Sequence, residues 1–192
     1  MGSWGAMEIV IVRDVLPPTQ YKYLIELFDS GDFEWHYKKH VHYVGEQDDN
    51  ITSDSHGLMK MFYINKMVVN PNFDKVTPIL FNLVDRLGKK LVTIHRIHAC
   101  LTININKDHN CYPHTDSDPL TMNSNWYTAI YYLGNSDGDT IFFEDDEQTI
   151  KHKQFFDSNS AVVFNGRIKH SGMLPRHHSN RIILNFNFEM ES

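Results

Sequence analysis

The chain has 192 residues, of which 41% are hydrophobic and 22% charged, as expected for one soluble globular domain with a proper core. Its formal net charge is -6 with histidines neutral. Nucleic acid is therefore disfavoured as the main partner, although a local basic groove would be compatible with this charge. Two cysteines, Cys100 and Cys111, are too few for a disulfide framework and fit a reducing, cytoplasmic compartment. We find no apolar run that could span a bilayer and no secretory signal.

The first elements follow a short leader. Met1–Ala6 precedes a second methionine and is expected to be an added segment, so that a single domain covers residues 7–192. Glu8–Val15 is a short apolar run that predicts a strand. Pro17–Phe28 predicts a helix, because prolines open it and apolar residues follow at helical spacing. Gly31 marks its end.

The next region contains a second helix. Residues 32–56 are polar and aromatic without a clear period, and we expect irregular strands and a mobile loop, Gly45–Ser55, there. His40 and His42 could share one strand face, but no third ligand follows at close range, so no metal site is predicted. A helix then begins at Asn72 or Asp74 and ends at Gly88, with an apolar stripe along it.

The C-terminal half has the pattern of short strands separated by turns. The predicted strands are His98–Asn106, Trp126–Leu133, Thr140–Glu144, Ser160–Phe164 and Arg181–Glu189. The expected turns are Asn135–Gly138, Asn165–Gly166 and Ser171–Gly172. The fold class predicted from this order is mainly β with flanking helices (α+β), a double-stranded β-helix or jelly roll of the cupin type.

Two of these strands carry polar side chains on one face. Alternation along His98–Asn106 groups His98, Cys100, Thr102, Asn104 and Asn106 on a single face. Along the last strand it groups Arg181 with Ile183, Asn185 and Asn187, and the other face can pack against helices. A buried arginine needs a partner, because an unpaired buried charge is very costly. Its planar fork suits a bound carboxylate, and a structural pair with an Asp or Glu explains it equally well.

A candidate metal site is formed by His114 and Asp116, in the motif H-T-D, together with the later His170. Two imidazoles and one carboxylate on one side of a metal leave the opposite positions open, as a non-haem Fe(II) oxygenase requires. A single H-x-D motif occurs by chance in many proteins. The metal prediction therefore depends on the motifs around it.

From about Arg96 to Glu189 the sequence resembles the 2-oxoglutarate and Fe(II)-dependent oxygenases, in particular the prolyl-4-hydroxylase-like branch and its small phage and bacterial members. The matching motifs occur in the family's order: H-T-D at 114–116, Y-T-A-I-Y-Y-L at 127–133, G-D-T-I-F-F at 138–143, V-V-F-N-G at 162–166, K-H-S-G at 169–172 and R-I-I-L-N-F at 181–186. Asp139 departs from the family, which usually has a second glycine there. This puts only the local turn geometry in doubt.

The resemblance implies a role for each matching residue. Iron would be held by His114, Asp116 and His170. Arg181 would bind the distal carboxylate of 2-oxoglutarate. The further residues expected at the co-substrate are Tyr132, Asn104 and Asn185. Cys111 and Tyr112, just before the motif, could line the entrance, and plain packing explains them equally well.

The implied reaction is hydroxylation of an unactivated C–H bond with Fe(II), 2-oxoglutarate and O2, and ascorbate as a reductant by analogy. A prolyl residue of a peptide or protein is the first substrate hypothesis, and the protein would act in the cytoplasm, or in a host cytoplasm if phage-encoded. The alternatives are the same chemistry on a free amino acid, another small molecule or an alkylated nucleic-acid base, or a non-catalytic metal-binding jelly roll. Tyr37–His56 and Ser117–Asn125 are the expected selectivity segments, with Gly45–Ser55 closing as a lid.

Overall fold

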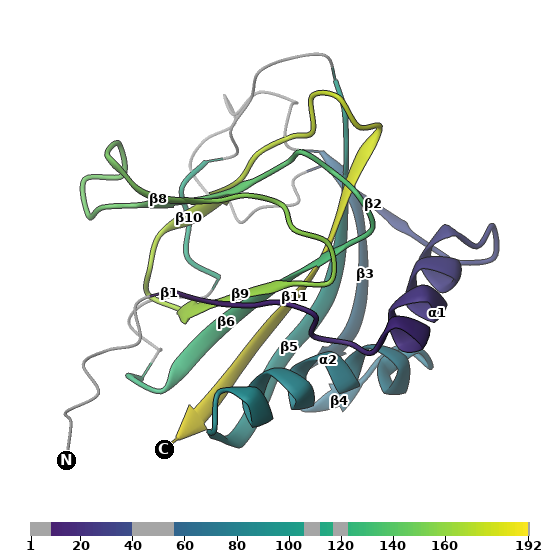
Figure 1. Ribbon diagram of the computed structural model, residues 1–192, viewed down its shortest axis with the longest axis horizontal. Helices are drawn as coiled ribbons and strands as arrows, with labels where there is room; N and C mark the ends of the chain where they lie inside the picture. Colours follow the sequence, from purple (N-terminus) through teal and green to yellow (C-terminus); the bar gives the residue numbers. More distant parts are fainter. Residues whose placement is uncertain (1–8, 40–55, 106–111, 117–122, 192) are drawn as a thin grey trace.

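The computed structural model describes residues 9–39, 56–105, 112–116 and 123–191 (Figure 1). Its two helices are α1 (Pro18–Asp29) and α2 (Phe73–Arg86). Its strands are β1 (Ile9–Val12), β2 (His36–Lys38), β3 (Gly57–Ile64), β4 (Met67–Val68), β5 (Lys90–Ile103), β6 (Trp126–Leu133), β7 (Thr140–Phe143), β8 (Ile150–Gln154), β9 (Ala161–Asn165), β10 (His170–Gly172) and β11 (Asn180–Glu191).

The strands form two antiparallel sheets. The large sheet has the order β1-β9-β6-β11-β5-β3-β2, with β4 also paired to β3, and the small sheet has the order β10-β7-β8. Figure 1 shows the two helices beside the large sheet, near β3, β5 and β11, and the small sheet on the other side. This arrangement is the jelly roll with flanking helices that the sequence predicts, and the predicted fold class is confirmed.

Each face of the large sheet packs against a different layer. On β11, Ile182, Leu184, Phe186 and Phe188 join the helix-side core together with α2 residues such as Ile79 and Leu80. Ile183 points the other way and joins a second apolar cluster between the sheets, with Phe142 of β7 and Phe164 of β9. Strand alternation therefore directs Arg181 and Asn185, which share the face of Ile183, into the space between the sheets.

Several predicted element boundaries were wrong. β5 begins at Lys90 rather than His98, and it ends at Ile103. β3 was not predicted, because its sequence G-L-M-K-M-F-Y-I lacks a clean alternation of apolar and polar residues. The turn predicted at Ser171–Gly172 lies in β10 and pairs with Ile141 and Thr140 of β7. Glycine there serves the close approach of another side chain, described below.

Some predictions fall on other parts of the chain. The leader Met1–Ala6, the loop Gly45–Ser55, Cys111 and most of Ser117–Asn125 lie outside the described residues. Among the residues described, no helix combines the length and apolar character needed to cross a membrane.

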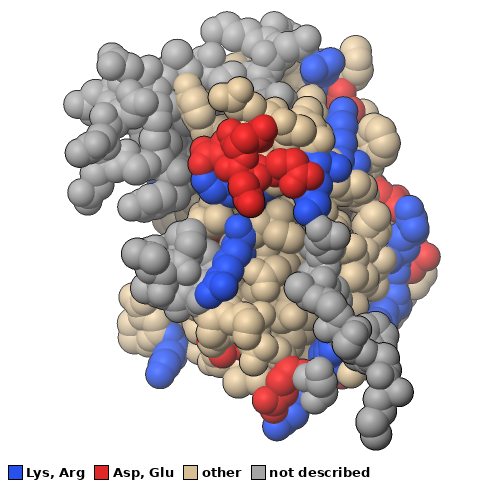
Figure 2. Space-filling view, turned by 90° about the vertical axis from the view of Figure 1, so that its left-hand side faces the viewer, with Lys and Arg blue, Asp and Glu red and all other residues tan. Residues whose placement is uncertain are grey.

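The turn between β7 and β8 carries the run Glu144–Glu147, and the face shown in Figure 2 has a cluster of acidic side chains over it. Lys151 and Lys169 form ion pairs with the two ends of this run.

Candidate metal centre

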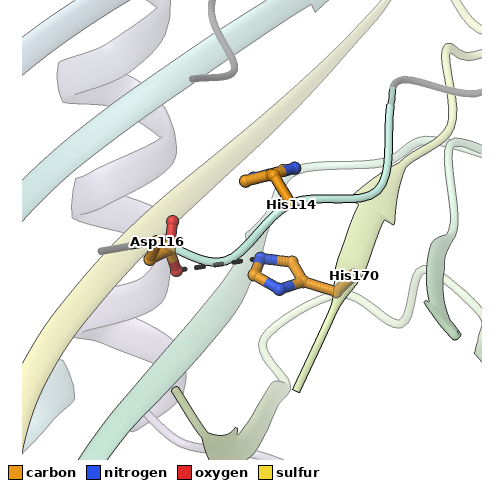
Figure 3. A group of neighbouring side chains, drawn as sticks. All are labelled: His114, Asp116 and His170. Carbon is orange, nitrogen blue, oxygen red and sulfur yellow. Dashed lines mark ion pairs between the residues drawn. The ribbon is translucent and has the colours of Figure 1, made fainter. Parts of the chain in front are cut away.

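The backbone brings the two histidines of the candidate site together. His114 and His170 form an isolated antiparallel bridge, in which each backbone N–H donates to the other residue's carbonyl oxygen at 3.0 Å. Their ring centroids are 4.7 Å apart. Figure 3 shows both rings and the Asp116 carboxylate around one small space. The two imidazoles are therefore paired by main-chain geometry, which needs no metal.

Hydrogen bonds also set the tautomer of each ring. Nδ1 of His114 lies 3.0 Å from the carbonyl oxygen of Tyr112, and Nδ1 of His170 lies 3.2 Å from that of Ile168. A carbonyl oxygen only accepts, so Nδ1 is the donor in both rings, and Nε2 is the nitrogen left to bind a metal. Burial, together with His114, lowers the pKa of His170 to about 4. That ring is therefore neutral at pH 7, as a metal ligand must be.

The Asp116 carboxylate accepts hydrogen bonds from four side chains. Asn185 Nδ2 lies 3.1 and 3.0 Å from its two oxygens, Asn187 Nδ2 and Thr128 Oγ1 lie 3.1 and 3.0 Å from Oδ2, and Arg96 Nη2 lies 3.2 Å from Oδ1. Arg96, Asn187 and Thr128 are direct cross-strand neighbours on β5, β11 and β6. One row across the sheet therefore orients the carboxylate.

The same contacts keep Asp116 ionised. Burial disfavours the charged form, but pairing with His170 and Arg96 and the hydrogen bond from Asn185 hold the pKa of this carboxyl well below its usual range. His170 Nε2 lies 3.7 Å from Asp116 Oδ2, and ligand atoms of all three residues lie within 4.8 Å of one another (Figure 3). Two imidazoles and one carboxylate fit a divalent transition metal with open positions, Fe(II) above all.

A cavity extends from this centre along β11 and β5. Its lining consists of His98, Cys100, Thr102, His114, Asp116, Ile130, His170, Gly172, Arg181, Ile183 and Asn185. The three candidate ligands lie at one end, Arg181 lies at the other, and apolar side chains lie between them. The cavity thus matches a ligand with two polar ends, one at the metal and one at a guanidinium.

Arg181 is 4% exposed and is held by neighbouring groups. Its Nε donates to the carbonyl oxygen of Gly138 at 2.7 Å, and its Nη2 donates to Thr140 Oγ1 at 3.1 Å. A Cβ on Gly138 would lie 2.5 Å from Arg181 Cδ, and a Cβ on Gly172 would lie 3.2 Å from Arg181 Nη1. Glycine at both positions leaves room for the arginine side chain beside β10 and the turn before β7.

The other predicted co-substrate residues have different positions. Asn185 lines the cavity, and its Nδ2 holds Asp116. Tyr132 is fully buried behind Arg181, donates its hydroxyl to Thr140 Oγ1 at 2.8 Å, and does not line the cavity. Burial raises the pKa of Tyr132 to about 12.

The structure does not bring Asn104 into the cavity. Its Nδ2 donates to the carbonyl oxygens of Arg176 and His178, at 2.7 and 3.2 Å. Asn104 lies just beyond the end of β5, so strand alternation no longer sets the direction of its side chain.

Sequence reasoning assigned no role to Arg96, Thr128 or His98. Strand alternation had placed His98 on the polar face, which was the one available indication. His98 is 5% exposed and lines the cavity. Burial and the charge of Arg96 lower the pKa of His98 to about 3, so its ring is neutral at pH 7.

A second hollow, a groove of about 580 Å³, meets the first at Asp116 and runs the opposite way along β11, past Asn187 to Glu189. His95 Nε2 lies 2.9 Å from Glu189 Oε1, and the His95 ring stacks on Trp126 with centroids 3.7 Å apart. Asp116 thus lines both hollows.

No protein-family model and no curated protein matches the chain in sequence. Solved structures do match it. A 2OG-Fe(II) oxygenase family oxidoreductase from Burkholderia pseudomallei has 12% identity and a TM-score of 0.64 over 94% of this chain and 84% of its own. The alpha ketoglutarate dependent epimerase SnoN from nogalamycin biosynthesis has 13% identity and a TM-score of 0.62, over 94% and 78%. A Pseudomonas putida prolyl-4-hydroxylase has 13% identity and a TM-score of 0.59, over 96% and 93%. The chain has the fold of the 2-oxoglutarate and Fe(II)-dependent oxygenases.

Proposed function

We propose that the chain is an Fe(II)- and 2-oxoglutarate-dependent dioxygenase that hydroxylates a C–H bond of a prolyl residue in a peptide or protein. The observation that carries the oxygenase assignment is one cavity with two imidazoles and a carboxylate at one end and a buried arginine at the other. Arg181 is held in place by hydrogen bonds to the Gly138 carbonyl oxygen and to Thr140 Oγ1.

His114, Asp116 and His170 would hold the metal through Nε2, a carboxylate oxygen and Nε2. When iron and both co-substrates are bound, 2-oxoglutarate and O2 give succinate, CO2 and one oxygen atom for the C–H bond, and the substrate leaves as an alcohol. Asn185, Asn187, Thr128 and Arg96 keep the carboxylate ionised and fixed, which orients the metal.

Arg181 would bind the far carboxylate of 2-oxoglutarate. Its guanidinium has five N–H donors, and the planar fork matches a carboxylate in bidentate geometry. Gly138 and Thr140 fix the stem and one edge of the guanidinium, so that little freedom is lost when the co-substrate binds. Ile130 and Ile183, between the two ends of the cavity, would exclude water from the methylene groups.

The groove supports an extended substrate. It reaches Asp116 from the side away from Arg181, so a second molecule could approach the metal while 2-oxoglutarate is bound. Its aromatic wall, Trp126 stacked on His95, suits a proline-containing chain, because such chains dock in aromatic-lined grooves. The resemblance to prolyl-4-hydroxylases points the same way. We also propose a cytoplasmic reaction, and ascorbate as the reductant on the resemblance alone.

The test measures succinate release by the Fe(II)-loaded protein with O2 and 2-oxoglutarate. Three substrate sets are compared: proline-containing peptides, free amino acids and methylated nucleotides, each with mass spectrometry of the product. We expect a gain of one oxygen atom on proline in a peptide. A product only among amino acids or nucleotides would reject the prolyl assignment.

The control is a variant with His170→Ala, which removes one metal ligand. We expect neither Fe(II) binding nor succinate from it, while circular dichroism stays that of the parent. If this variant binds iron and turns over like the parent, the oxygenase assignment itself is wrong.

A further inference from the structure

Three side-chain atoms on the cavity wall have no hydrogen-bond partner among the residues that the structure describes. They are His98 Nδ1, Thr102 Oγ1 and Asn185 Oδ1. The three residues are 5%, 3% and 5% exposed, so bulk water does not explain them. Buried polar atoms in folded proteins are nearly always hydrogen-bonded. These atoms therefore indicate that a polar ligand completes the cavity.

The register of β5 and β11 spaces these atoms along the cavity. His98 is paired with Asn185, Cys100 with Ile183, and Thr102 with Arg181. From one end to the other, the wall is polar, then apolar, then polar. Four residues of strand separate His98 from Thr102, or about 13 Å between backbone positions. A dicarboxylate with a methylene spacer has the same order of polar and apolar parts.

His98 lies at the metal end of this series. Its strand partner Asn185 donates to Asp116, and the Asp116 carboxylate also accepts from three other side chains. A neutral imidazole has one N–H donor. A carboxylate of the co-substrate, bound beside the metal, would be a suitable acceptor for the N–H of His98.

We propose that His98 is a co-substrate-binding residue whose ring N–H donates a hydrogen bond to the carboxylate at the metal end of 2-oxoglutarate. The inference rests on the proposed function and deepens it, because it assigns the end of the ligand that Arg181 does not reach. It also predicts which acids bind: those with a carboxylate next to a keto group, held by the metal and His98 together.

The test uses calorimetry on the Mn(II)-loaded protein, so that binding is measured without turnover. His98→Leu removes the donor at similar volume, and His98→Asn keeps an N–H near the position of Nδ1. We expect His98→Leu to bind 2-oxoglutarate about 10-fold to 100-fold more weakly, as for a lost hydrogen bond to a charged group. His98→Asn should keep most of the affinity, and both variants should bind Mn(II) and melt like the parent.

Pyruvate separates the two ends of the ligand, because it has the keto acid end and no far carboxylate. His98→Leu should weaken pyruvate binding by the same factor as 2-oxoglutarate binding. The matched control is Thr102→Val, which removes the unpartnered hydroxyl opposite Arg181. It should weaken 2-oxoglutarate and leave pyruvate unchanged.

Two negative results are distinguishable. If the parent binds Mn(II) but neither keto acid, the proposed function is refuted, and the proposed role of His98 is refuted with it. If the parent binds 2-oxoglutarate while His98→Leu and His98→Asn bind it equally well, only the role of His98 is overturned. The same holds if His98→Leu weakens 2-oxoglutarate but not pyruvate.

Discussion

A single methyl group at Gly138 should disturb both the fold and the co-substrate site. In Gly138→Ala the new Cβ would lie 2.5 Å from Arg181 Cδ and 2.7 Å from the carbonyl oxygen of Met173. Carbon atoms in contact are normally about 3.5–4.0 Å apart, so neighbouring atoms must move by about 1 Å. The Met173 carbonyl cannot retreat easily, because the same residue's N–H donates to Asp139 O at 2.9 Å.

Overpacking of this kind costs about 1–3 kcal/mol. For a chain of this length, that lowers the melting temperature by about 2–12 °C. Displacement of Arg181 Cδ also breaks the hydrogen bond from Nε to Gly138 O, so 2-oxoglutarate should bind about 10-fold to 100-fold more weakly. Differential scanning fluorimetry and calorimetry on the Mn(II)-loaded protein measure the two effects.

The matched control is Gly31→Ala, because a Cβ at Gly31 meets nothing within 4 Å. Its melting temperature and its affinity for 2-oxoglutarate should stay close to those of the parent. Gly172→Ala is intermediate: the new Cβ would lie 3.2 Å from Arg181 Nη1, at the end of a flexible side chain. It should affect co-substrate binding more than stability. If Gly138→Ala behaves like Gly31→Ala in both assays, the close packing of Arg181 against Gly138 is refuted.

Three further predictions address the remaining parts of the site. Arg181→Ala should weaken 2-oxoglutarate binding by about 2–5 kcal/mol and leave Mn(II) binding intact, and unchanged affinity in calorimetry would make Arg181 purely structural. Asn187→Leu removes the hydrogen bonds that Asn187 donates to Asp116 and to Thr128. Metal affinity, measured by competition with a chelating dye, should therefore fall about 10-fold to 100-fold. An unaltered affinity would contradict the role of the row Arg96, Asn187 and Thr128. Metal-free protein should become less stable as the pH falls from 6.5 toward about 4. In the folded chain the pKa values of His98 and His170 are lowered to about 3 and about 4, so these rings stay neutral over that range. In the unfolded chain both histidines take up a proton, which favours unfolding. The slope is about 1.4 kcal/mol per pH unit for each histidine. Urea unfolding at pH 7, 6 and 5 measures the free energy of unfolding and therefore this slope. His98→Asn should reduce the slope. Equal stability of the parent at all three pH values would refute the prediction.

Local patterns were sufficient for the parts of the fold that depend on one segment. Alternation along β11 placed Arg181 and Asn185 on one face and Phe186 on the other before any pairing was known. The spacing of His114 and Asp116 also predicted two candidate ligands within three residues. A strand fixes such relations through its own geometry, so the sequence carries them directly.

Other features depend on strands that are distant in sequence, and these could not be predicted. Arg96, Thr128 and Asn187 meet only because β5 and β6 both pair with β11 in one register. Asn104 was expected to contact the co-substrate, but it does not line the cavity, for a related reason. β5 ends one residue earlier, and an acceptor from another loop, the Arg176 carbonyl, takes the amide.

The four donors around Asp116 have a consequence for the oxidation state of the proposed centre. Each hydrogen bond withdraws electron density from the carboxylate and makes it a weaker donor to the metal. A weaker anionic donor stabilises Fe(III) less than a free carboxylate would, so the reduction potential of the centre rises. The row Arg96, Asn187 and Thr128 would thereby favour the ferrous state, and the resting protein would resist oxidation by air between turnovers.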